Sequence, residues 1–144
     1  MDEPTRVLLL ERDLFFSVKI RDTLRHSGYE TVTARNEDDF ARKLATNTPA
    51  LAIVNTSLAG VAWERVIAAA KAAGVPTLAF GAHVDLEAQQ AARRAGADRV
   101  ISNSRLAKDL PAIVERLVRG SKVGVESAEA AQDADDAEDD DVEG

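Results

Sequence analysis

One polar side chain, Asn55, stands where an α/β protein could do chemistry. It directly follows the apolar run at residues 50–54, which is typical of a buried parallel strand. Open α/β sheets bind their ligands at the carboxyl ends of such strands. An amide there can donate and accept hydrogen bonds, but it is uncharged and cannot act as a carboxylate nucleophile. The sequence therefore predicts a pocket that has the position of an active site and lacks its nucleophile.

The elements that must position this side chain alternate along the chain as short apolar runs and longer amphipathic segments. We expect strands at residues 6–10, 29–34, 50–55, 75–80 and 97–102. We expect helices at residues 14–27, after the capping residue Asn36, and at 61–73, 86–95 and 106–119. Strands separated by helices imply parallel pairing, with helices on both faces of the sheet. Five such units predict a flavodoxin-like, doubly wound five-stranded parallel sheet of order 2-1-3-4-5.

The order and spacing of these pieces resemble the CheY-like receiver domain of bacterial response regulators, over about residues 5–120. An apolar strand ends in Glu-Arg-Asp at 11–13, Gly-Tyr-Glu enters the second strand at 28–30, and Asn55 closes the third. Val-Pro opens the fourth strand at 75–76, and Ala-Gly-Ala-Asp precedes the fifth at 95–98. The resemblance implies the same α/β fold and a role in signal transduction.

In that family, two adjacent carboxylates hold a magnesium ion and an aspartate accepts a phosphoryl group. A hydroxyl then senses the phosphoryl group, and a lysine pairs with it. By position, Glu11 keeps the first carboxylate, and the other four roles fall to Arg12, Asn55, Gly81 and Asn103. Val100 replaces the aromatic residue that reports phosphorylation on the fifth strand. The resemblance therefore implies a degenerate receiver, or pseudo-receiver, without the ordinary phosphorylation switch.

The same substitutions affect the magnesium position of the family, because they leave only Glu11 and Asp13 as charged ligands. We expect Arg12 to place its guanidinium there and to pair with Glu11 or Asp13. We therefore predict no metal and no cofactor. Two simpler interpretations remain: Asn55 bonds to backbone groups of a loop, and Glu11 and Arg12 form a solvated ion pair.

Charge divides the 144 residues into two regions. Residues 126–144 contain ten carboxylates and no lysine or arginine, while residues 1–125 carry 18 basic and 15 acidic residues. We expect a receiver-like domain at 1–122 and a disordered acidic tail at 123–144. The absence of cysteine excludes disulfides and thiol catalysis. No apolar run approaches the roughly 20 residues that span a bilayer, and the start is acidic, so we expect a cytoplasmic protein.

Basic residues gather in the last third of the domain, on the predicted face of the fourth helix, fifth strand and fifth helix. They include Arg93, Arg94, Arg99, Arg105 and Lys108. Such a face could bind an acidic protein partner or a second copy of the chain, and the acidic tail could compete for it in cis. A solvated helical face and a solubilising tail are the alternatives. We expect no binding to nucleic acid, since the domain is only mildly basic.

Three function classes follow from these features. The favoured one is a pseudo-receiver that acts as a phosphorylation-independent protein–protein interaction module in bacterial signalling or regulation, and not as an enzyme. A second is a receiver that is still switched by phosphorylation at a non-standard residue such as Ser57. The third is a small α/β enzyme or ligand-binding protein, against which the missing catalytic cluster and glycine-rich phosphate loop count.

Overall fold

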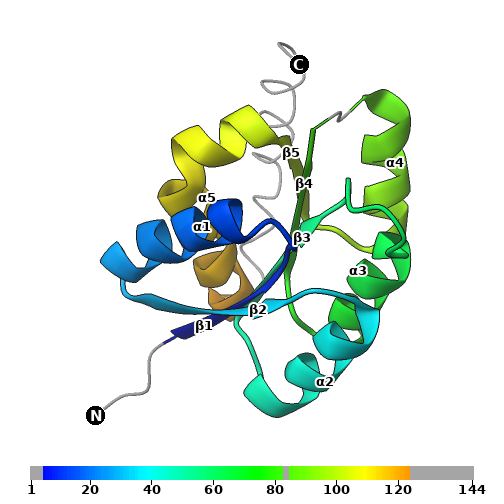
Figure 1. Ribbon diagram of the computed structural model, residues 1–144. Coiled ribbons are helices and arrows are strands. Elements are labelled where there is room, and N and C mark those ends of the chain that lie inside the picture. Colours follow the sequence, from blue (N-terminus) through cyan, green and yellow to red (C-terminus); the bar gives the residue numbers. More distant parts are fainter. Residues whose placement is uncertain (1–4, 83–84, 124–144) are drawn as a thin grey trace.

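The computed structural model describes residues 5–82 and 85–123, which form a sheet of five parallel strands between two helical layers (Figure 1). The strand order is β2-β1-β3-β4-β5, and every neighbouring pair is parallel. The predicted order 2-1-3-4-5 is therefore confirmed. The strands are β1 (Thr5–Leu10), β2 (Tyr29–Ala34), β3 (Leu51–Asn55), β4 (Thr77–Gly81) and β5 (Arg99–Ser102).

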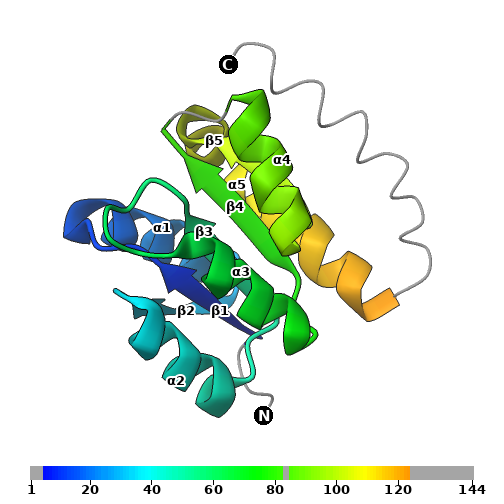
Figure 2. The same cartoon turned by 90° about the vertical axis from the view of Figure 1, so that its right-hand side faces the viewer.

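The helices connect consecutive strands and cover both faces of the sheet. They are α1 (Leu14–His26), α2 (Glu37–Asn47), α3 (Trp63–Ala72), α4 (Leu86–Ala95) and α5 (Asn103–Val123). Figures 1 and 2 show α1 and α5 on one face and α2, α3 and α4 on the other. None of the helices within the described ranges is long and apolar enough to cross a membrane.

Two hydrophobic cores hold the three layers together. Along β1, Val7 and Leu9 pack under α1 and α5, while Leu8 and Leu10 pack under the other helices, and all four are fully buried. Successive side chains of a strand point to opposite faces, so a strand covered on both sides must be apolar throughout. The first polar residue after each run therefore marks the edge of the sheet. At β1 and β3 these residues are Glu11 and Asn55.

Side chains cap α1, α2 and α4 at their first turns. Asp13 accepts a hydrogen bond from the Phe16 N–H (3.1 Å), and Asp85 accepts one from the Ala88 N–H (2.8 Å). The predicted cap at Asn36 is confirmed, because its Oδ1 accepts from the Asp39 N–H (2.8 Å). Each cap satisfies a backbone donor that lacks a partner within its helix. These caps fix where α1, α2 and α4 leave the edge that carries the candidate site.

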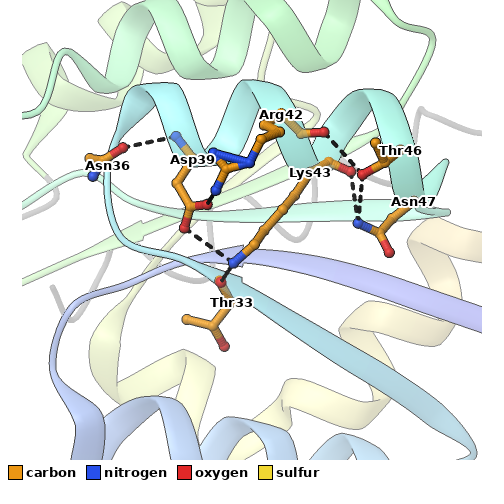
Figure 3. A network of polar contacts seen from close by, with 7 residues as sticks. All are labelled: Thr33, Asn36, Asp39, Arg42, Lys43, Thr46 and Asn47. Atoms are coloured by element: carbon orange, nitrogen blue, oxygen red, sulfur yellow. Dashed lines mark hydrogen bonds and ion pairs between the residues drawn. The ribbon is translucent and has the colours of Figure 1, made fainter.

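A polar network ties α2 to the edge strand β2 (Figure 3). Lys43 Nζ donates to the Thr33 carbonyl (2.7 Å) and to Asp39 Oδ2 (3.1 Å), and Arg42 also pairs with Asp39. Burial alone would raise the pKa of Asp39, but the hydrogen bond and charge of Lys43, helped by a backbone hydrogen bond and Arg42, lower it. The network occupies a backbone acceptor of an edge strand and fixes the helix beside the site.

The last helix differs from its predicted bounds of 106–119. It begins at Asn103 and continues through Gly120 to Val123, with a non-helical residue at Asp109 (φ −120°, ψ 18°). Pro111 follows this kink, and a proline in the first turn of a helical segment costs little because it has no N–H to satisfy. Smaller differences are the later starts of β4, β5 and α3, each by two residues. The predicted acidic tail lies outside the described residues from Gly124 on.

Candidate functional site

The site is built at the carboxyl edge of the sheet, which we define as the edge where the five parallel strands end. Leu10 lies opposite Val54, Asn55 opposite Phe80, and Gly81 opposite Ser102. Because parallel strands end side by side, the residues that follow them become neighbours. The register therefore places Glu11, Asn55 and Gly81 at this one edge.

Glu11 is the buried charge of the site, with only 2% of the residue exposed. Its Oε1 accepts a hydrogen bond from Asn55 Nδ2 (2.7 Å), and its Oε2 accepts from the backbone N–H groups of Arg12 and Asp13 (2.9 Å each). Three N–H donors thus face one carboxylate, which compensates for the loss of water around it. The carboxylate is satisfied by the protein itself.

Asn55 uses both ends of its amide. While Nδ2 donates to Glu11, Oδ1 accepts from the Ser57 N–H (2.8 Å). The two bonds agree on one orientation of the amide, because only its nitrogen can donate to a carboxylate and only its oxygen can accept from a backbone N–H. Asn55 therefore joins the end of β1 to the loop after β3, and part of the simpler interpretation, a bond to loop backbone, is also correct.

Arg12 does not form the predicted ion pair with Glu11 or Asp13. Its Nε donates to the Arg35 carbonyl (3.2 Å) and its Nη1 to the Ala59 carbonyl (3.0 Å), and Arg35 Nη1 donates back to the Arg12 carbonyl (3.3 Å). Both carboxylates are already engaged, Glu11 by its three donors and Asp13 as the cap of α1. The guanidinium instead bridges the loops that follow β2 and β3.

Gly81 has no room for a side chain. A Cβ atom at this position would lie 2.6 Å from Thr56 Oγ1 and 3.0 Å from Ser57 Oγ. Thr56 Oγ1 donates to the Phe80 carbonyl (3.3 Å), and Ser57 Oγ accepts from the Ala82 N–H (3.0 Å). Two hydroxyls from the β3–α3 loop thus fill the space above the end of β4. The sequence analysis did not identify Thr56. The available signal was that hydroxyl residues at 56 and 57 follow one strand while a glycine at 81 ends the next.

The two remaining positions lie on and after β5. Val100 is 3% exposed and packs in the core beneath α3 and α4, while Asn103 is exposed at the first residue of α5. Ser102 Oγ accepts from the Arg105 N–H (3.2 Å) at the start of the same helix. No contact in the described residues brings Asn103 to Glu11 or Asn55.

Comparison with solved structures gives consistent matches. A CheY-like receiver domain protein from Methanospirillum hungatei has a TM-score of 0.76 at 20% identity, covering 83% of this chain and 98% of that one. The signal receiver domain of a modulated diguanylate cyclase from Desulfovibrio desulfuricans gives 0.73 at 22% identity, covering 85% and 98%. A two-component response regulator from Clostridium difficile gives 0.74 at 17% identity, covering 80% and 96%.

The chain has the fold of CheY-like receiver domains. No protein-family model matches the sequence, and no curated protein matches it. Since these three structures are 17–22% identical to the chain, they establish the fold of the domain, and its chemistry must be argued from the residues at its carboxyl edge.

The magnesium ion associated with the receiver fold does not fit these residues. Mg²⁺ requires near-octahedral oxygen ligands and binds proteins through one or two carboxylates. Here both oxygens of Glu11 face N–H donors, Asn55 turns its nitrogen toward Glu11, and the Asp13 carboxylate caps a helix. Within residues 5–82 and 85–123, no cluster of three or more His, Asp or Glu side chains could hold a metal ion.

The predicted basic face of the receiver fold is smaller than expected. Arg93, Arg94 and Lys108 are exposed, but Arg99 is only 5% exposed, so its predicted place on the surface is wrong. The reason is that β5 is covered by helices on both faces. Arg105 is half-buried and forms an ion pair with Asp109 (2.8 Å). Of these five residues, three remain exposed: Arg93 and Arg94 on α4 and Lys108 on α5.

Proposed function

We propose that this protein is a phosphorylation-independent interaction module: a receiver fold that binds protein partners in signal transduction or regulation and catalyses no reaction itself. The observation that carries this proposal is the hydrogen bond at the carboxyl edge in which Asn55 Nδ2 donates to the buried Glu11 carboxylate. We expect the protein to work in the cytoplasm.

The chemistry of the edge argues against phosphoryl transfer. An amide at Asn55 is not a nucleophile of the kind that forms an acyl phosphate. An incoming phosphoryl group would also have to displace the donors that now serve Glu11 and would meet that carboxylate as a second negative charge. The described edge presents no lysine to offset this repulsion, since Asn103 stands at that position and is exposed.

Hydrogen bonds hold the two loops, β3–α3 and β4–α4, that a switch at this edge would have to move. Ser57 holds the Ala82 N–H of the β4–α4 loop, and Arg12 holds the Ala59 carbonyl of the β3–α3 loop. A hydroxyl side chain at position 81 would collide with Thr56 and Ser57. These contacts support a single preformed arrangement of the edge, which suits a module that offers a constant surface to its partner.

The surface for a partner would include exposed residues on several helices. On α4 and α5 these are the cations Arg93, Arg94 and Lys108. On α1, Phe15 is 82% exposed and Leu14 is 69% exposed, and exposed aromatic side chains are typical of binding surfaces. A second copy of the chain is one possible partner.

The test is to incubate the full-length protein with a small-molecule phosphodonor and Mg²⁺ and to record its intact mass. We expect no adduct on the wild type. The Ser57→Ala variant runs in parallel, because an adduct that disappears in that variant would establish the alternative of a receiver switched at Ser57. Treated and untreated protein are then used to capture partners from the same extract. Equal recovery is expected, and a partner bound only after treatment would contradict the proposal.

A further inference from the structure

A corner of exposed positive charge lies at the amino edge of the sheet, the edge where the strands begin. Helices α3 and α4 run back to this edge, and their last turns carry Lys71 and the pair Arg93 and Arg94. All three side chains are exposed, and none forms an ion pair within residues 5–82 and 85–123. We call these three residues the amino-edge corner.

The three cations belong to one place because α3 and α4 touch there. The stem of Lys71 packs against Gly96, the residue that ends α4: a Cβ added to Gly96 would lie 2.5 Å from Lys71 Cδ. In the turn after α4, Asp98 Oδ2 accepts a hydrogen bond from the Thr77 N–H (2.8 Å). This turn therefore contributes one carboxylate against the three cations of the amino-edge corner.

The last helix ends at the same edge of the sheet. Glu115 and Arg119 of α5 both act on the pKa of Tyr29, the first residue of β2, which places this part of α5 at the beginning of the strands. The chain after α5 contains ten carboxylates and no lysine or arginine within residues 124–144. The most acidic segment of the protein therefore starts at the edge where the amino-edge corner lies.

We propose that the acidic segment 124–144 binds the amino-edge corner of its own chain. Reach does not limit the contact: 21 residues span at most about 70 Å, whereas four strand spacings from β2 to β5 amount to about 19 Å. Attachment to the same chain gives the segment a high effective concentration at the corner. Because the cations are exposed, the contact weakens as salt rises.

Such a contact gives the basic face a regulated state. While segment 124–144 covers Arg93 and Arg94, an acidic partner must displace it, and the partner's apparent affinity falls accordingly. The intramolecular contact requires neither phosphorylation nor a partner. It is therefore tested separately from the proposed function.

The chain has no cysteine, so a single cysteine can be labelled without interference. A nitroxide spin label on the full-length Ala137→Cys protein broadens amide NMR signals of residues near the acidic segment. We expect broadening at residues 69–74 and 93–96 well above that at residues 19–23, and we expect it to fade with added salt. Mixing spin-labelled protein with isotope-labelled protein that carries no spin label should give no broadening, because the contact lies within one chain.

Two charge variants decide the site. In Lys71→Gln/Arg93→Gln/Arg94→Gln, broadening at the corner should fall to the level of residues 19–23. The matched control Lys19→Gln/Arg21→Gln/Lys108→Gln removes three exposed cations elsewhere and should leave the broadening intact. The proposal is overturned if the signals of the amino-edge corner are not broadened in Ala137→Cys, or if they are broadened only in the mixed sample of two copies. It is also overturned if the broadening survives in the first charge variant or is lost equally in the control variant.

Discussion

The two edges of the sheet treat their polar groups in opposite ways. At the carboxyl edge, the buried Glu11 carboxylate receives three N–H donors, and Arg12 binds two carbonyls. At the amino edge, Lys71, Arg93 and Arg94 are exposed and have no ion-pair partner among the described residues. A polar cluster that satisfies itself contributes to folding and needs no ligand, whereas unpaired surface charge contributes little to folding and is available for binding. The buried polar groups of the carboxyl edge are therefore not available to a ligand, whereas the three cations of the amino edge are.

The largest effect is expected at Glu11. Replacing it by alanine leaves the Asn55 amide and two backbone N–H groups without their acceptor, so we expect Glu11→Ala to lower the free energy of unfolding by about 3 kcal/mol. Urea denaturation followed by the fluorescence of the single tryptophan, Trp63, measures this. The exposed Glu30, which pairs with Arg6 (3.1 Å), is the control, and Glu30→Ala should cost about 0.5 kcal/mol. Equal losses of unfolding free energy in the two variants would show that the buried hydrogen bonds of Glu11 stabilise the fold no more than a surface ion pair does.

Gly81 tests the crowding of the same edge. The Cβ of Gly81→Ala would overlap Thr56 Oγ1 and Ser57 Oγ, and we expect a loss of about 2 kcal/mol in the free energy of unfolding. Removing the nearer hydroxyl in Thr56→Ala/Gly81→Ala should restore part of that loss. If the loss of unfolding free energy in the double variant equals the sum of the losses in Thr56→Ala and Gly81→Ala, the two residues do not share this space.

Arg12 should have a smaller and more local effect. Without its bonds to the Arg35 and Ala59 carbonyls, we expect Arg12→Gln to lose about 1 kcal/mol of unfolding free energy. We also expect faster amide hydrogen exchange in the loops after β2 and β3, because these loops would open more often. Arg21→Gln on α1 is the matched control. Unchanged exchange in both loops would mean that Arg12 does not hold them.

The smallest expected effect is on the pKa of Tyr29 at the amino edge. Burial and the Glu115 charge raise the pKa of its phenol, and Arg119 partly opposes them. A raised pKa favours the neutral phenol in the folded protein, so its stabilisation is complete below the ordinary pKa of about 10 and is lost as pH rises through the folded pKa. Ultraviolet titration of this single tyrosine should show a lower pKa in Glu115→Gln and a higher one in Arg119→Gln. Shifts in the reverse directions would contradict this electrostatic account.

The sequence was sufficient to predict the fold because apolar runs covered on both sides, such as β1 and β3, admit few other arrangements. The strand pattern also assigns Glu11 and Asn55 to one edge of the sheet, since the ends of neighbouring parallel strands lie side by side. It could not predict where Arg12 points, because a long side chain chooses among carbonyls and carboxylates that only the folded loops bring near. The burial of Arg99 and the close approach of Thr56 to Gly81 likewise depend on packing across elements.

The most direct test of the account is a magnesium titration followed by amide NMR on the wild type and on Asn55→Asp. In the wild type, the N–H donors around Glu11 leave no ligand set for the ion, so we predict no shifts at residues 11–13 and 55–57. In Asn55→Asp, two carboxylates face each other and should gain a magnesium response that relieves their repulsion. Magnesium-dependent shifts at Glu11 and Asn55 in the wild type would contradict the claim that this edge satisfies itself.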